Sequence, residues 1–179
     1  MKRNFEIFTI VYLLACCAAA SLTIAAPLPV RSFQKDASGV TIKLKSGALR
    51  LEVCDDRTIH VIYGLKDKPP EKKEFVVIRQ WMPARFQWRE EPSQFILRTA
   101  RMGVTVNRTT GALTFVDAAG KILVQDPADG GRTITEAKPD STGGANQAPI
   151  YRPQQTFLSP KGERLYDMAQ CQDGVWNWR

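Results

Sequence analysis

The sequence is poor in the residue types on which most metal and nucleophilic sites depend. It contains one histidine, His60, and four cysteines, of which Cys16 and Cys17 lie in its first segment. A Cys/His metal site is therefore nearly excluded. The motifs G-x-S-x-G, H-E-x-x-H, G-x-x-x-x-G-K-S/T and G-x-G-x-x-G are also missing. We therefore assign no catalytic residue, no metal ligand and no cofactor from these patterns.

The length and the charge pattern exclude further classes. The chain has 179 residues, whereas a (β/α)8 barrel typically takes ~250. One domain is the default at this length. Lysine and arginine outnumber aspartate and glutamate by 25 to 18, but they are scattered singly among acids, as in residues 66–74. With no basic stripe and no nucleic-acid motif, we expect no nucleic-acid partner.

Residues 1–26 have the pattern of a secretory signal peptide. Lys2 and Arg3 precede an uncharged, mostly apolar stretch over residues 7–20, and small residues follow. A charged start, a short apolar run and a small-residue exit are typical of such leaders. We therefore expect a secreted or periplasmic protein whose folded domain covers residues 27–179.

Two alternatives for the leader and one for the cysteines stay open. The apolar stretch is nearly as long as a membrane-spanning helix, so an uncleaved anchor is one alternative. Residues 13–16 loosely resemble a lipobox, so a lipid anchor on Cys16 is another. Cys54 and Cys171 could pair in an oxidising compartment, which the sequence cannot show. The alternating run before Cys54 favours a buried thiol.

After the leader the hydrophobic pattern has a period of two rather than 3.6. Short runs rich in β-branched residues, each bounded by turn residues, predict strands. The runs are 40–45, 49–53, 59–63, 75–78, 86–89, 95–99, 104–106, 113–116 and 121–124. Regularly spaced strands without an amphipathic helix predict an all-β fold, an antiparallel β-sandwich or barrel. Residues 126–149, rich in glycine and proline, predict a long loop with a short strand at 133–135.

The hairpin signal is strongest at residues 104–116. Asn107 and Gly111 at its corner are predicted to supply positive φ angles. Asn107 also begins an N-x-T sequon, but the turn explains the asparagine better. His60 lies in a strand, where we expect it half exposed and without the partner and cleft that a general base needs. The adjacent acids 55–56 and 90–91 are expected to face solvent on turns.

The tryptophans are the weak candidates for sugar binding. Trp176 and Trp178 stand two residues apart, which would place them on one face of a strand. Trp81 and Trp88 are the other two. Packing in a core or an interface is the favoured interpretation for all four, and Trp176 and Trp178 remain candidate substrate-binding residues.

The C-terminal segment carries the most specific pattern. From Glu163 it reads E-R-L-Y-D-M-A-Q-C-Q-D-G-V-W-N-W-R. It closely resembles the segment that ends the N-terminal β-sandwich of family-31 glycoside hydrolases, E-x-L/F-Y-G-L-G-Q-H/R-Q-x-G-x-x-N-Y/W-R/K-G, especially in the bacterial α-xylosidase and α-glucosidase branch. The matching residues are Glu163, Leu165, Tyr166, Gln170, Gln172, Gly174, Asn177, Trp178 and Arg179. Asp167 and Ala169 replace two family glycines, so the chain departs from the family pattern at a turn where glycine allows extra backbone freedom.

The resemblance covers roughly residues 32–179 and implies a galactose-mutarotase-like sandwich. In that family, two aspartates on a following (β/α)8 barrel carry out retaining hydrolysis of α-glucosides or α-xylosides. None of the acids here matches those positions. The resemblance therefore implies a non-catalytic domain whose partners are the barrel of the parent enzyme and, through the whole enzyme, an α-linked oligosaccharide.

The sequence ends inside the family motif, which leads to an expectation about the completeness of the chain. Arg179 falls inside the family motif and before any barrel, so we expect a truncated fragment that is inactive alone. Its exposed interface should make it prone to association. Val175, Trp176 and Trp178 would then pack at the domain junction, whereas the family loop that helps to wall the substrate cleft follows the motif and should be mostly missing. The alternative is a stand-alone carbohydrate-binding or structural β-sandwich module of the cell envelope.

Overall fold

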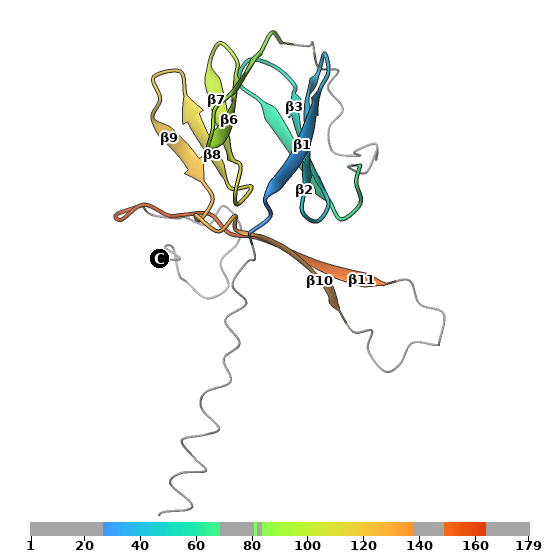
Figure 1. Ribbon diagram of the computed structural model, residues 1–179. Helices are drawn as coiled ribbons and strands as arrows, with labels where there is room; N and C mark the ends of the chain where they lie inside the picture. Colours follow the sequence, from blue (N-terminus) through green and yellow to red (C-terminus); the bar gives the residue numbers. More distant parts are fainter. Residues whose placement is uncertain (1–26, 69–80, 82–83, 138–148, 164–179) are drawn as a thin grey trace, which may run out of the picture.

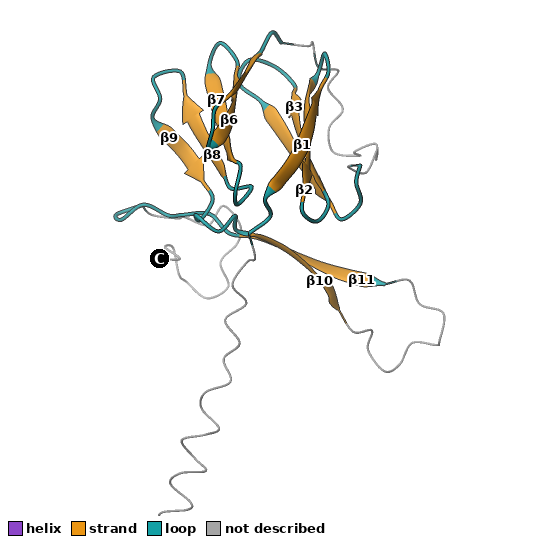
Figure 2. Ribbon diagram, in the orientation of Figure 1, coloured by secondary structure: helices purple, strands orange, loops and turns teal. Residues whose placement is uncertain are grey.

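Two antiparallel sheets face each other, and a two-stranded ribbon projects from one end of them (Figure 1). This computed structural model describes residues 27–68, 81, 84–137 and 149–163. Strands and loops make up all of these residues, with no helix among them (Figure 2). In the same residues there is accordingly no helix long and apolar enough to cross a membrane. The predicted all-β sandwich is confirmed.

Each sheet is a meander of neighbouring hairpins. The first sheet has the order β1-β2-β3-β4, and the second has the order β5-β6-β7-β8-β9. The first contains β1 (Val30–Lys35), β2 (Gly39–Leu44), β3 (Ala48–Val53) and β4 (Ile59–Gly64). The second contains β5 (Gln87–Glu90), β6 (Gln94–Arg98), β7 (Met102–Asn107), β8 (Leu113–Asp117) and β9 (Ile122–Gln125). The ribbon pairs β10 (Arg132–Ala137) with β11 (Ile150–Gln155).

The core lies between the two sheets, because alternate residues of each strand point inward. β2 and β3 bring Ile42 and Leu49 opposite each other, and β6 and β7 do the same with Leu97 and Val104. All four are fully buried, and burial of each such side chain is worth about 1.5–3 kcal/mol. The full cluster is Val40, Ile42, Leu44, Leu49, Leu51, Val53, Phe95, Leu97, Val104, Val106 and Leu113.

Aromatic side chains extend the core toward the edges formed by β1 and β5. Trp88 stacks on Phe95 with ring centroids 5.2 Å apart, and Phe33 packs edge-on against Phe95 at 5.1 Å. Such pairs add about 0.5–1.5 kcal/mol beyond their buried area. Trp88 is therefore a packing residue, as expected from the sequence.

The β7–β8 hairpin shows how its turn is held. The Asn107 side-chain oxygen accepts hydrogen bonds from the backbone N–H groups of Thr109 (2.9 Å) and Thr110 (3.0 Å). Gly111 has a φ of 70°, and among the described residues only glycines have positive φ. The expectation of positive φ at Asn107 was therefore wrong: its carboxamide, rather than its backbone angle, shapes the turn.

The structure contains strands that the pattern did not predict. β1 breaks the period of two because its register with β2 shifts between Val30 and Ser32, so that Val30 and Phe33 both turn toward the core. The predicted strand at 133–135 is longer, and its partner β11 contains Pro153, which a ribbon edge tolerates. The predicted strand at 75–78 lies outside the described residues.

Candidate interaction surface

The histidine and the two adjacent pairs of acids are engaged in structural contacts. His60 on β4 pairs across the strands with Glu52 on β3, and its Nδ1 lies 3.4 Å from the Glu52 Oε2. Both side chains are about one third to two fifths exposed on the outer face of the first sheet. His60 is thus the half-exposed strand histidine that the sequence predicts.

The two adjacent pairs of acids do not form carboxylate pairs. Asp56 forms an ion pair with Arg101 at 3.1 Å, and Glu90 forms one with Arg108 at 3.2 Å. Their neighbours act locally: Asp55 accepts a hydrogen bond from the Arg57 backbone N–H, and Glu91 accepts one from the Gln94 side chain. Among the described residues, no three His, Cys, Asp or Glu side chains are grouped so as to hold a metal ion.

Several predicted site residues fall outside the described part of the chain. These are Trp176 and Trp178 and the family-motif residues Tyr166, Gln170, Gln172, Gly174, Asn177 and Arg179. Cys171 also falls there, whereas Cys54 is buried, as its strand pattern predicts.

A buried ion pair fixes the point where the ribbon leaves the sandwich. Arg132, the first residue of β10, donates from Nη1 to the Asp126 Oδ2 at 2.9 Å, and the two side chains are only 6% and 1% exposed. Asp126 also accepts the Leu113 backbone N–H at 2.8 Å and the Gln155 side-chain amide at 2.9 Å. A second Arg132 nitrogen donates to the Gly111 carbonyl. Local pattern contains no signal for this network, because Asp126 and Arg132 lie in a stretch that predicts a loop and their other partners come from different segments of the chain.

Burial dominates the electrostatics of this pair. It raises the pKa of the Asp126 carboxyl, against the lowering effects of Arg132 and of the hydrogen bonds from Leu113 and Gln155. It also lowers the pKa of the Arg132 guanidinium. Removing one member would leave the other as an uncompensated buried charge. The pair therefore holds the ribbon to β8 and to the β7–β8 turn.

Large apolar side chains are exposed on the ribbon and near its base. β9, the edge strand of the second sheet, exposes Ile122, Leu123 and Val124 by 40–54%, and β11 exposes Ile150 and Tyr151 by 47–52%. After β11 the Leu158 N–H donates to the Gln125 carbonyl at 2.8 Å, which sets this segment beside the end of β9. Phe157 and Leu158 are also about half exposed.

We call these seven residues the β9–ribbon surface. They lie on β9, on the segment after β11 and at the outer end of the projecting ribbon (Figure 1), and exposed apolar patches of this kind mark interaction sites. A projecting ribbon with a buried anchor can insert between elements of a partner, since its base does not have to move. The arrangement therefore suits docking against another folded domain.

Solved structures with the same fold as this chain are glycoside hydrolases. No protein-family model matches the chain. A family-31 α-xylosidase from Xanthomonas citri aligns with 80% of the chain at 25% identity and a TM-score of 0.65. A family-31 α-xylosidase from a soil metagenome, complexed with xylose, aligns with 82% of the chain at 16% identity and a TM-score of 0.61.

A third structure extends the comparison beyond xylosidases. A family-31 dextranase from Flavobacterium johnsoniae aligns with 64% of the chain at 19% identity and a TM-score of 0.53. The aligned part makes up only 15%, 23% and 16% of these three proteins. The resemblance to family-31 glycoside hydrolases is confirmed: this chain shares the fold of one segment of those much longer enzymes.

Proposed function

We propose that the chain is the N-terminal β-sandwich of a secreted or periplasmic family-31 α-glycosidase. In this role it packs on a (β/α)8 catalytic barrel and helps to shape a cleft for α-linked glucosides or xylosides. The observation that carries the proposal is the alignment with the Xanthomonas citri α-xylosidase, at 25% identity over 80% of this chain. The C-terminal sequence motif supports it independently.

The contacts of the acidic residues support a non-catalytic role. Retaining glycosidases hold two carboxyl groups about 5–5.5 Å apart across the scissile bond. Here Asp56, Glu90 and Asp126 each form an ion pair with an arginine. Acidic side chains that are paired with arginines in this way hold turns and strands in position. The nucleophile and the acid/base would come from the barrel.

The β9–ribbon surface supports a domain interface. Covering apolar area stabilises a contact by about 25 cal/mol per Å². Tyr151 adds an amphipathic ring, of the kind enriched at interfaces. In the proposed enzyme this surface faces the rest of the polypeptide.

The gene itself provides the test. We expect the reading frame beyond codon 179 to continue into a barrel with a nucleophilic aspartate. The complete protein should then release nitrophenol from p-nitrophenyl α-xyloside or α-glucoside, whereas the 179-residue chain should not. A stop codon with no barrel encoded nearby would reject the proposal. Calorimetry of the chain with neutral oligosaccharides would then test the stand-alone carbohydrate-binding module.

A further inference from the structure

Three arginines gather on the outer face of the second sheet. Ala84, Phe86 and Trp88 pack against the core, so the alternate residues Arg85, Gln87 and Arg89 point to the opposite face, where all three are exposed. On β6, Arg98 stands opposite Gln87. The register thus places Arg89 and Arg98 on one face, and Arg85 lies in the segment just before β5, two residues before Gln87.

The stem of Arg98 is held in place by a glycine. Arg98 also pairs with Gly103 on β7. A Cβ atom at Gly103 would lie 3.4 Å from the Arg98 Cγ and 3.2 Å from a Val116 methyl. The aliphatic part of Arg98 therefore lies across the glycine, and its guanidinium extends over the sheet. This support reduces the entropy that the side chain loses on binding.

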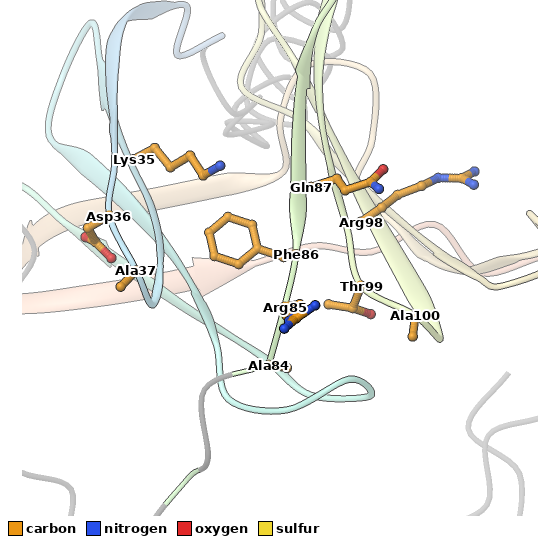
Figure 3. A pocket seen from close by; sticks show the side chains of 10 residues that line it. All are labelled: Lys35, Asp36, Ala37, Ala84, Arg85, Phe86, Gln87, Arg98, Thr99 and Ala100. Atoms are coloured by element: carbon orange, nitrogen blue, oxygen red, sulfur yellow. The ribbon is translucent and has the colours of Figure 1, made fainter.

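These arginines line two adjoining hollows. One, of about 870 Å³, opens between β1 and β5 and includes Arg85, Gln87, Arg98 and Thr99 in its lining. The other, of about 300 Å³, is lined by Gln87, Arg89, Ile96 and Arg98. Figure 3 shows Phe86 directed toward β1, with Gln87 and Arg98 directed away from it. Gln87 and Arg98 line both hollows, so the two adjoin each other, and we call them together the groove.

The groove has an uncompensated positive charge. Within the described residues, no hydrogen bond or ion pair engages the guanidinium of Arg85, Arg89 or Arg98. Asp36 also lines the larger hollow, but Arg50 binds both of its oxygens, at 2.6 and 2.9 Å. The guanidinium groups are therefore available for an anion.

We infer that this groove binds a carboxylate-bearing polysaccharide. Guanidinium forks match carboxylates in a bidentate geometry. Arg85, just before β5, and Arg89, within it, are four residues apart, which is about 13 Å at ~3.3 Å per residue of extended chain and too far for one small anion. A polymer with carboxylates in series fits such a row. Gln87 between the cations supplies the neutral donor and acceptor that sugar hydroxyls need. This inference does not rest on the proposed function.

The test uses the full 179-residue chain and polygalacturonate as the probe, with neutral dextran as the matched polymer. We expect calorimetry or affinity electrophoresis to detect binding to polygalacturonate and not to dextran. Raising the salt concentration should weaken it. The double variant Arg89→Gln/Arg98→Gln should bind at least about tenfold more weakly, because each charge-assisted hydrogen bond contributes more than one neutral bond does.

The control removes the same charge elsewhere. Arg57 and Arg152 are exposed, and no described contact engages their guanidinium groups. The variant Arg57→Gln/Arg152→Gln should keep the full affinity. If both double variants lost the same amount of affinity for polygalacturonate, the effect would come from net charge alone, and the inference would be overturned. The absence of polygalacturonate binding, or equal binding to anionic lipid vesicles, would also overturn it. Arg89→Gln alone, at an exposed site, provides the comparison if the double variant fails to fold.

Discussion

The Arg132 guanidinium lies 2.9 Å from the Asp126 carboxylate at the base of the ribbon, and both side chains are almost completely buried. This contact joins the strand that leaves the sandwich to the segment that follows β9. Gln155 from β11 binds the same carboxylate, so both ribbon strands are tied to one point. Both ribbon strands are therefore attached at this charged centre, and the hydrogen bond from the Leu158 N–H to the Gln125 carbonyl adds a neutral contact nearby.

We predict that Asp126→Asn destabilises the chain strongly. Breaking a buried pair from one side costs about 3–5 kcal/mol, since the arginine is left without its counter-charge. Urea unfolding followed by tryptophan fluorescence would measure the change. Asp67→Asn is the matched control: Asp67 pairs with Lys43 at 3.8 Å on the surface, where such pairs contribute about 0–1 kcal/mol. Equal losses in both variants would contradict the role of the buried pair.

A second prediction concerns acid stability. The hydrogen bonds from Arg50 hold the pKa of the Asp36 carboxyl well below its ordinary value, with Ser38 adding to the effect. A carboxyl whose pKa is lower in the folded state stabilises the fold above its unfolded pKa. That stability is lost as the pH falls toward the folded pKa. We therefore expect unfolding on acidification below about pH 4 to be less steep in Asp36→Asn than in the parent chain.

Thermal melts over that pH range would measure the difference.

The stability contribution of Asp126 changes with pH in the opposite direction to that of Asp36, because burial raises the pKa of the Asp126 carboxyl. Its contribution is present at low pH and falls as the pH rises through the folded pKa.

If Asp36→Asn left the slope of melting temperature against pH unchanged, Asp36 would not govern the acid response.

The core strands could be predicted from the sequence because one face of each is buried. Val40, Ile42 and Leu44 alternate with polar residues, and all three are in the core. β1 could not be predicted, because the register shift after Val30 breaks the alternation. β11 could not be predicted either, since its residues are all exposed and pair only with β10.

The arginine groove and the Asp126–Arg132 pair were harder to predict from the sequence than the strands were. The basic residues look scattered along the chain, yet strand pairing brings Arg98 opposite Gln87, two residues from Arg89, and Arg85 lines the same hollow as Arg98. The Asp126 and Arg132 pair is hidden in a stretch of glycine and proline that predicts a loop. Both depend on contacts between segments, which local pattern does not encode.

Gly111 provides a test of the β7–β8 turn. Its φ is 70°, and a Cβ atom there would lie 2.7 Å from the Leu28 carbonyl oxygen. Gly111→Ala should therefore cost more than the roughly 1–2 kcal/mol of left-handed strain alone. Gly120→Ala is the control, since Gly120 has a φ of 86° with open space around it. Chemical unfolding should rank Gly111→Ala as the less stable variant, and the reverse order would contradict the close contact with Leu28.

The last prediction concerns self-association of the 179-residue chain. β9 is an edge strand that exposes Leu123 by 54%, and edge strands with exposed apolar residues pair with other chains. We expect sedimentation velocity to show concentration-dependent association, which Leu123→Lys should reduce without lowering the melting temperature. Leu65→Lys is the matched control, because Leu65 is a comparably exposed leucine in the loop after β4, the edge strand of the other sheet. If Leu65→Lys reduced association as much as Leu123→Lys, the effect would come from added charge, and β9 would not be the contact.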